Sequence, residues 1–447
     1  VTGVQTCALP IFAFGGSKVD GARYANDALA RGAVAVVYDA APAVPPRHPY
    51  LVVAHGRHAL ALASKRFYNL PDEAIDIIAF TGTNGKSTGT MLADGILQHA
   101  GHKTSLINTI GYHVGGQSRP AVNTTPESLD IYRIAAETRD LGGRFLSMEI
   151  SSHALALGRA EYLKVAAAVF TNLTRDHLDY HRDMDEYFDA KSKLFTQYLA
   201  PEGVAVVNGD DEWGQRLAAE LKGMKRTAWR FSMKNPQAEI LGSDAKVTLE
   251  GIELSVKTPS GTIKLKSGLT GNHNVENLLA ATGLAVAAGM PRGAITTGVS
   301  FVNRVPGRLE RISGKGMHVF VDYAHTDDAL RRVMSTLRTL SKGRLIVLFG
   351  CGGDRDQGKR PLMGEAAGKA ADQVIVTSDN PRSESPTAIA AMITPGLEKV
   401  GMKKMNLKDL ANGDRGYAVE LDRKLAIEIA IGLGREGDVV IIAGKGH

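Results

Sequence analysis

Short apolar runs, each followed by a polar or glycine-rich turn and then a helical pattern, recur along this chain of 447 residues. Apolar runs of this length that are bounded by turn residues are typical of buried strands. They predict strands at 77–80, 145–149, 167–172, 204–208, 319–322, 345–349, 373–377 and 439–443. Because strands alternate with helices, we expect an α/β fold with parallel sheets and functional residues after the carboxyl ends of the strands.

The same pattern divides the chain into three parts. Residues 12–74 form a small α/β unit with a helix at 24–31, residues 75–308 form a central part, and residues 309–447 form a third part. The central part includes a β-rich insert at about 225–269, where polar and apolar residues alternate. Residues 1–11 lack the features of a signal peptide, and we interpret them as non-native sequence. We expect the first and third parts to be incomplete.

Composition narrows the class of protein. Hydrophobic residues make up 44% and charged residues 22% of the chain, and only two cysteines occur. No apolar run approaches the roughly 18 residues that a membrane span requires. The net charge of +6 is spread along the chain, which suits anionic small molecules better than nucleic acid. We therefore expect a cytoplasmic monomer that acts on small molecules, without a membrane or nucleic-acid partner.

The segment 78–88 (IAFTGTNGKST) is the most informative part of the sequence. An apolar strand enters a glycine-containing loop, which leads into a helix that begins near Lys-Ser-Thr. Glycine lets a backbone approach an anion, and a helix start directs its free N–H groups at phosphate. Lys86 would bind the β- and γ-phosphates of a nucleotide, and Ser87 would bind Mg²⁺. The alternative is an ordinary turn that caps a helix, because Phe80 stands where the standard motif begins with glycine.

Charged residues follow two other predicted strands. Glu149 ends an apolar strand, where a carboxylate is costly without a partner, and a divalent cation is a natural partner. His177 follows the next strand together with Asp176 and Asp179, which favours a metal ligand over a structural histidine. Lys191 and Lys193 lie on the following helix, and an exposed helix face is the simpler interpretation of both.

The remaining polar clusters are weaker signals. The stretch 123–126 (NTTP) can be a capped turn, and the amides of 271–277 (GNHNVEN) can pair with an adenine edge or cap a helix. The glycine-rich stretch 350–355 ends in Arg355 and suits an anion. The stretch 379–382 (DNPR) can be an Asx turn fixed by proline.

Taken in order, these motifs resemble those of the Mur ligase family, whose members are ATP-dependent amide-bond ligases. The matching stretches are TGTNGKST, NTTP, MEISSHAL, TNLTRDHLDYH, GNHNVENLLAA, VPGRLE, VDYAHT, GCGGDRDQGKRP, DNPR and AGKGH. The resemblance implies a small α/β N-terminal domain, a central P-loop ATPase-like parallel sheet and a Rossmann-like C-terminal domain. Within this family, the DNPR stretch resembles that of the members that add meso-2,6-diaminopimelate to UDP-MurNAc-L-Ala-D-Glu.

The resemblance also implies roles for individual residues. The ATP site comprises Gly82, Thr83, Asn84, Gly85, Lys86, Ser87, Thr88, Asn274, Asn277, Arg308 and Asp322. The UDP-MurNAc-dipeptide site comprises Ser17, Lys18, Val19, Asn123, Thr124, Thr125, Ser151 and Arg159. The diaminopimelate site comprises Arg355, Asp379, Asn380, Pro381, Arg382 and Gly444. Ser87, Glu149 and His177 would bind Mg²⁺, and the catalytic group is Lys86, Glu149, His177 and Lys191.

The implied reaction has two steps and one modified residue. A substrate carboxylate attacks the γ-phosphate of ATP to give an acyl phosphate, which the amine of the amino acid then attacks. Lys191 matches a position that is carbamylated by CO₂ in this family. The alternatives are a ligase that adds lysine, another Mur or folylpolyglutamate-type ligase, a non-catalytic nucleotide-binding protein, and a plain NTPase.

Overall fold

The computed structural model describes residues 10–16, 19–178, 180–312 and 316–445. The chain forms two compact units. Unit 1 comprises Val1–Phe231 and Ala280–Met290, and unit 2 comprises Ser232–Leu279 and Pro291–His447. Three of the residues singled out above, Ser17, Lys18 and Asp179, lie outside the described residues.

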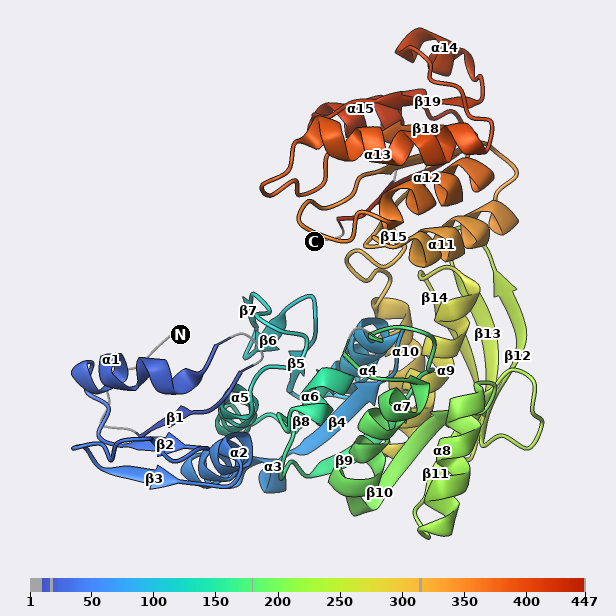
Figure 1. Ribbon diagram of the computed structural model, residues 1–447. Helices are drawn as coiled ribbons and strands as arrows, with labels where there is room; N and C mark the ends of the chain where they lie inside the picture. The colour runs from blue at the N-terminus through green and yellow to red at the C-terminus, as the bar shows by residue number, and fades with distance from the viewer. Residues whose placement is uncertain (1–9, 17–18, 179, 313–315, 446–447) are drawn as a thin grey trace. The chain divides into compact units, whose positions relative to one another are not determined.

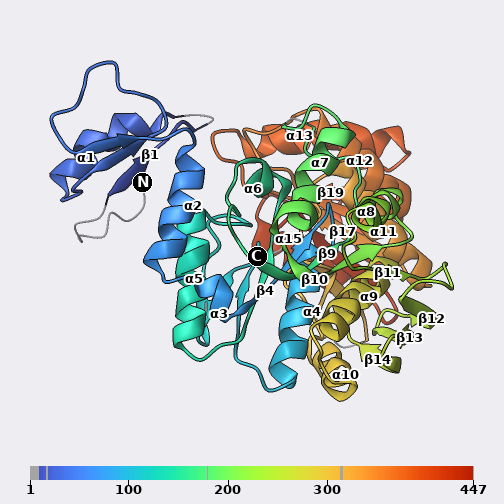
Figure 2. The same ribbon diagram turned by 90° about the horizontal axis from the view of Figure 1, so that it is seen from below.

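Unit 1 begins with a small parallel sheet. Its strands are β1 (Ile11–Ala13), β2 (Val36–Tyr38) and β3 (Tyr50–Val52), in the order β1-β2-β3. The predicted helix at 24–31 is the short helix α1 (Ala25–Ala30), preceded by a 3₁₀ turn that Asp20 caps. Helix α2 (Gly56–Phe67) follows and packs beside α5 (Ser128–Asp140) (Figures 1 and 2).

The main sheet of unit 1 has the strand order β11-β10-β9-β4-β8-β5-β6-β7. All neighbours from β11 to β5 pair in parallel, whereas β5, β6 and β7 pair antiparallel. The strands are β4 (Asp76–Thr81), β5 (Thr104–Ile107), β6 (Tyr112–Val114), β7 (Gln117–Arg119), β8 (Phe145–Glu149), β9 (Val165–Phe170), β10 (Leu199–Asn208) and β11 (Ala228–Ser232). The other helices are α3 (Pro71–Ala74), α4 (Lys86–His99), α6 (Ser152–Ala156), α7 (Met184–Lys193) and α8 (Glu212–Gly223). Strand β4 lies between β8 and β9, so the loops after these three strands share one edge.

Unit 2 contains an antiparallel meander and a six-stranded sheet. The meander consists of β12 (Ile240–Val247), β13 (Ile252–Thr258) and β14 (Gly261–Ser267), and buried and exposed residues alternate along β13 as predicted. Helices α9 (Asn272–Ala287), whose last residues belong to unit 1, and α10 (Arg292–Phe301) follow.

The six-stranded sheet has the order β15-β16-β20-β17-β18-β19 and is parallel except for β15. Its strands are β15 (Glu310–Ile312), β16 (His318–Asp322), β17 (Leu345–Phe349), β18 (Gln373–Val376), β19 (Gly416–Val419) and β20 (Val439–Ala443). Its helices are α11 (Asp327–Leu340), α12 (Lys359–Ala370), α13 (Pro386–Lys399), α14 (Leu407–Asn412) and α15 (Arg423–Leu433). Helices α11 to α13 cover one face and α15 covers the other (Figure 1).

The α/β prediction is confirmed, and each predicted strand of the two large parallel sheets lies within two residues of its expected position, apart from the longer start of β10. Strands β5 to β7, β15 and β19 were not predicted. In the part of the chain that the structure describes, none of the helices combines the length and the apolar character that a membrane span requires.

Candidate active site

The loop between β4 and α4 has the backbone of a phosphate-binding loop. Gly82 and Gly85 adopt positive φ values of 142° and 90°. A Cβ at Gly82 would lie 1.9 Å from Thr171 Oγ1, so only glycine fits there. Lys86 is the first residue of α4, with Ser87 and Thr88 in the same turn. The free N–H groups of this turn are suited to bind phosphate oxygens.

The end of β9 holds this loop in place. The Thr83 N–H donates to the carbonyl of Asn172 (2.9 Å), and the Asn84 N–H donates to Asn172 Oδ1 (3.0 Å). Thr171 Oγ1 donates to the carbonyl of Asn84 at 2.6 Å. A second strand therefore fixes the loop, which preorganises it for an anion.

Two lysines converge on the carbonyl of Gly82. Lys86 Nζ and Lys191 Nζ each donate to this oxygen at 2.9 Å. Lys191 is only 1% exposed, so the exposed-face interpretation of this residue is wrong. Burial, and then the charge of Lys86, lower the pKa of Lys191 well below its usual value. Two positive charges this close repel each other. The repulsion favours the binding of an anion, and it also favours the neutral form of the buried Lys191 amine.

Glu149 ends β8 with its side chain fully buried, next to Phe80 of β4. Its carboxylate accepts the Thr109 N–H (2.9 Å) and the Thr109 hydroxyl (3.1 Å). Thr109 lies just after β5 and was not singled out from the sequence. A buried carboxylate held by two donors keeps further lone pairs for another ligand.

His177 lies in the loop after β9 with a positive φ of 53°. Its side chain is 44% exposed, and Nε2 lies 3.7 Å from Asp176 Oδ2. The ring packs against His153 with centroids 4.9 Å apart. Among the described residues, no three His, Cys, Asp or Glu side chains form a metal-binding group. A metal at this edge would therefore need ligands such as hydroxyls, phosphate oxygens or water.

The predicted substrate residues of unit 1 gather beside Glu149. Thr125 Oγ1 donates to the carbonyl of Glu149 (3.0 Å) and accepts the N–H of Ser151 (3.0 Å). Arg159 donates to the carbonyl of Thr125 at 2.9 Å. Thr109 Oγ1 lies 3.1 Å from Thr124 Oγ1, which connects this loop to the Glu149 carboxylate.

Asn123 completes this loop, because its carbonyl accepts the Tyr112 hydroxyl at 2.6 Å. Glu127 was not predicted, and its carboxylate lies 3.0 Å from Arg159 Nε. Val19 is 43% exposed, and its carbonyl accepts the N–H of Gly16 at 3.0 Å. The structure thus brings together the five central substrate residues.

The predicted adenine and nucleotide residues of unit 2 lie in two places. Asn277 Nδ2 donates to Asn274 Oδ1 (2.9 Å), and Asn274 Nδ2 donates to the carbonyl of Thr270 (2.7 Å). Both amides are buried in the first turns of α9. Asp322 ends β16 and accepts the N–H groups of Leu309 (2.7 Å) and Ala324 (2.8 Å).

Burial raises the pKa of Asp322, although these hydrogen bonds oppose the shift. The guanidinium of Arg308 lies 5.7 Å from the centre of the Tyr323 ring. The N–H of Gly444 donates to the carbonyl of Asp322 at 3.1 Å, because β16 and β20 are neighbours. Asp322 and Gly444 therefore share one edge of the six-stranded sheet.

The loops after β17 and β18 contain the predicted amino-acid residues. Arg382 Nη1 donates to the carbonyl of Gly353 (2.5 Å), and the Gly353 N–H donates to the carbonyl of Asn380 (2.9 Å). A Cβ at Gly353 would lie 1.9 Å from the Pro381 carbonyl, so glycine permits this contact. Arg355 and Arg382 are exposed, and Asp379 is half-buried. Two cationic side chains at adjacent strand ends suit a carboxylate ligand.

Other side chains, which were not singled out from the sequence, support the loops after β17 and β18 and the end of β20. The fully buried Arg360 forms an ion pair with Glu384, whose side chain is 21% exposed. Arg423 begins α15 and donates to the carbonyl of Ala443 at 3.1 Å. Arg360 belongs to the GCGGDRDQGKRP stretch, which resembles a motif of the Mur ligase family. No feature of the sequence indicated that the Arg360 side chain is buried.

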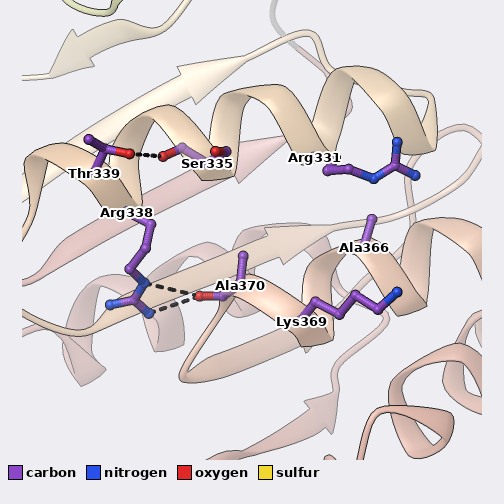
Figure 3. A pocket seen from close by; sticks show the side chains of 7 residues that line it. All are labelled: Arg331, Ser335, Arg338, Thr339, Ala366, Lys369 and Ala370. Atoms are coloured by element: carbon purple, nitrogen blue, oxygen red, sulfur yellow. Dashed lines mark hydrogen bonds between the residues drawn. The ribbon is translucent and has the colours of Figure 1, made fainter.

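A cavity of about 270 Å³ lies away from these strand ends, between α11 and α12 (Figure 3). Its lining includes Arg331, Arg338 and Lys369. Each of these cations pairs with a carboxylate: Asp327, Asp372 and Glu365, respectively. The paired charges make this cavity a weak candidate for an anionic substrate.

The phosphate loop, its two lysines and the buried Glu149 at adjacent parallel strand ends define a nucleotide-dependent enzyme of the α/β class. Three family profiles match the chain: "Mur ligase family, catalytic domain" at residues 2–68, "Mur ligase middle domain" at 80–285, and "Mur ligase, glutamate ligase domain" at 307–446. The chain belongs to the Mur ligase family, and it is an ATP-dependent ligase.

Relatives with known names agree with this assignment. The UDP-N-acetylmuramoyl-L-alanyl-D-glutamate--2,6-diaminopimelate ligase of Solibacter usitatus is 45% identical over 98% of this chain and 85% of its own length. The protein of the same name from Geobacter metallireducens is 42% identical over 98% of this chain and 86% of its own length.

Solved structures agree as well. A structure of a ligase with that name has a TM-score of 0.72 and 34% identity, and the match covers 98% of this chain and 86% of that chain. The Mycobacterium tuberculosis folylpolyglutamate synthase complexed with ADP shares the fold, with a TM-score of 0.68 and 18% identity over 87% of this chain and 92% of that chain. The predicted three-domain Mur ligase architecture is confirmed at the level of the fold.

Proposed function

We propose that this ligase joins meso-2,6-diaminopimelate to the D-Glu carboxylate of UDP-MurNAc-L-Ala-D-Glu, with ATP as the energy source. The observation that supports the proposal most strongly is the gathering of Lys86, Lys191, Glu149 and the 123–125 loop around neighbouring strand ends. The names of the relatives and the DNPR stretch supply the substrate. We assign the reaction to a cytoplasmic monomer with domains at 12–74, 75–308 and 309–447.

In the first step, the D-Glu carboxylate attacks the γ-phosphorus of ATP, the bond to the β-phosphate oxygen breaks, and ADP leaves. Lys86 and the N–H groups at the start of α4 offset the repulsion between the two anions. Thr124, Thr125, Ser151 and Arg159 would orient the UDP-MurNAc-dipeptide. In this role, Arg159 is held by the Thr125 carbonyl and Glu127.

The residues present fit a magnesium site. Mg²⁺ is usually held by one or two carboxylates together with phosphates and water, and the buried Glu149 at the end of β8 with the Ser87 hydroxyl in the first turn of α4 would supply protein donors of this kind. Bound Mg²⁺ would neutralise developing charge on the phosphates. His177 would hold a second ion. The lowered pKa of Lys191 leaves a neutral amine, which is the form that reacts with CO₂ to give an anionic carbamate.

In the second step, the amine of diaminopimelate attacks the acyl carbon and phosphate leaves. Arg382 would bind the distal carboxylate of the amino acid through two parallel hydrogen bonds, a geometry that lysine cannot offer. Arg355, Asp379, Asn380 and Gly444 would complete this pocket, and within unit 2 we assign nucleotide binding to Asn274, Asn277, Arg308 and Asp322.

The test is phosphate release from ATP in the presence of UDP-MurNAc-L-Ala-D-Glu, with meso-diaminopimelate, with L-lysine, or without an amino acid. We expect release with diaminopimelate alone. Release with lysine instead would still indicate a ligase, but it would refute the role of Arg382. Release without any amino acid would indicate an NTPase, and no release at all would refute the proposed function.

A further inference from the structure

An ion pair between a fully buried arginine and a glutamate whose side chain is 21% exposed joins the loops that follow β17 and β18. Arg360, in the first turn of α12, has a fully buried side chain. Its Nη2 and Nη1 donate to Glu384 Oε1 (2.7 Å) and Oε2 (2.8 Å), so the pair is bidentate. Glu384 lies just after DNPR, and Arg360 lies in the segment that follows GCGGDR.

The pair fixes the position of both loops. Arg360 Nη2 also donates to the carbonyl of Gly352 at 3.3 Å, and Glu384 Oε1 accepts the N–H of Asp354 at 2.6 Å. Asp354 in turn accepts the Ser383 hydroxyl at 2.6 Å. The two side chains therefore link the glycine-rich loop to the DNPR loop at their base.

The backbone above the pair is held in an uncommon conformation. Asp354 and Arg382 have positive φ values of 53° and 48°, which cost energy in a residue other than glycine. Such conformations persist where surrounding contacts determine them, and here those contacts are the bonds to Glu384, Ser383 and Gly353.

Stability alone is a weak reason for such a pair. The buried Arg360 guanidinium has lost its water, and replacing an ion pair that carries such a cost with apolar residues of similar size is often neutral or stabilising. The hydrogen bonds from Arg360 lower the pKa of Glu384 to about 2, so the carboxylate is ionised at neutral pH. The pair bonds to the backbone of Gly352 and Asp354, on either side of the Gly353 carbonyl to which Arg382 Nη1 donates.

We propose that Arg360 and Glu384 are positioning residues for amino-acid selection: they hold the DNPR loop so that Arg382 faces the distal carboxylate of the incoming amino acid. In this scheme both residues act through the loops, because the Arg360 side chain is fully buried and the Glu384 carboxylate is bonded to Arg360 and to the N–H of Asp354. This inference rests on the proposed function. It extends that function by naming residues outside the pocket that govern its preference for diaminopimelate over lysine.

The test uses the complete chain and the double variant Arg360→Met/Glu384→Leu, which replaces the pair with apolar side chains of similar length. Glu384→Gln is the single variant, and Glu365→Gln is the matched control because it removes the two ion pairs that Glu365, on the same helix as Arg360, forms with Lys369 and Lys399. The measurements are the thermal midpoint, the KM for each substrate, and the ratio of kcat/KM for diaminopimelate to that for lysine.

We expect the double variant to remain folded, with the KM for diaminopimelate raised about tenfold or more and the preference over lysine reduced. The KM values for ATP and for the UDP-linked substrate should stay within twofold, and the control should match the wild type. A folded double variant with an unchanged KM for diaminopimelate would overturn the inference while the proposed function stands. A wild type without diaminopimelate-dependent phosphate release would overturn both.

Discussion

The strand ends of unit 1 and those of the six-stranded sheet in unit 2 present reactive groups in different ways. In unit 1, the key side chains are buried: Glu149 is 0% and Lys191 is 1% exposed, and both bond to nearby groups of the protein. In unit 2, Arg355 and Arg382 are exposed, and the ion pair that supports their loops combines a fully buried Arg360 with a Glu384 side chain that is 21% exposed.

The difference follows from what each region has to recognise. The triphosphate carries the same charge whichever amino acid is added, so fixed donors with little access to water stabilise it best. Selection among amino acids depends on one terminal group, which an exposed guanidinium on a supported loop can distinguish. Changes in unit 1 should therefore alter turnover with every amino acid, whereas changes in the DNPR loop should alter preference.

The largest expected effect is that of Lys86→Ala. It removes a cation at the start of α4 that bonds to the carbonyls of Gly82 and Thr83. We expect kcat to fall by roughly 10³-fold, as for other losses of a charged group that stabilises phosphoryl transfer. Steady-state phosphate release measures it, with Lys193→Ala as the control. A fall that differs between diaminopimelate and lysine would break the separation of the two regions.

Lys191→Met should have the next largest effect, with kcat lowered by about 10²-fold for all amino acids. It also tests the pKa of Lys191, which burial lowers well below its usual value in the folded chain. At pH values between the lowered pKa of Lys191 in the folded chain and its usual pKa in the unfolded chain, Lys191 binds more protons in the unfolded state than in the folded state. The free energy of unfolding should therefore rise with pH across this window and fall as the pH drops.

Urea unfolding in CO₂-free buffer at several pH values measures this dependence. The contribution of Lys191 to the slope should vanish in Lys191→Met and persist in Met184→Leu, a control on the same helix without a titratable group. An identical slope in the wild type and Lys191→Met would show that the buried amine keeps its proton.

Arg382→Lys should change the preference for diaminopimelate over lysine, with little change in the KM for ATP. Lysine keeps the charge but loses the planar pair of donors, so we expect the KM for diaminopimelate to rise roughly 10- to 100-fold. The control is Arg331→Lys, a cation that lines the cavity between α11 and α12 (Figure 3). A KM for ATP that rises to the same extent would contradict the division of labour between the regions.

Sequence reasoning found the residues that follow long apolar strands, because parallel strands bring their carboxyl ends to one edge. Glu149 and the phosphate loop were placed together in this way. Thr109 was missed because β5 is short and its partner lies 40 residues further along the chain. The burial of Lys191 and Arg360 could not be predicted either, since it arises from packing of α7 and α12 rather than from their local patterns.

The smallest expected effect, that of Thr109→Val, concerns this missed residue. The change keeps the shape of the side chain and the backbone N–H bond to Glu149, but it removes the hydroxyl that bonds to Glu149 Oε2 and approaches Thr124. A group that orients a metal ligand commonly affects metal affinity by 10- to 100-fold, and the retained N–H bond places this variant near the low end, at about tenfold. Direct Mg²⁺ titration of the protein and the Mg²⁺ dependence of phosphate release both measure the change, and Thr109→Ser should restore the wild-type values. Because Glu149 and Thr124, which Thr109 contacts in the described part of the chain, both belong to unit 1, the preference for diaminopimelate over lysine should remain constant. A shift in that preference would mean that the buried carboxylate also influences amino-acid selection, and the two regions could then no longer be treated as separate.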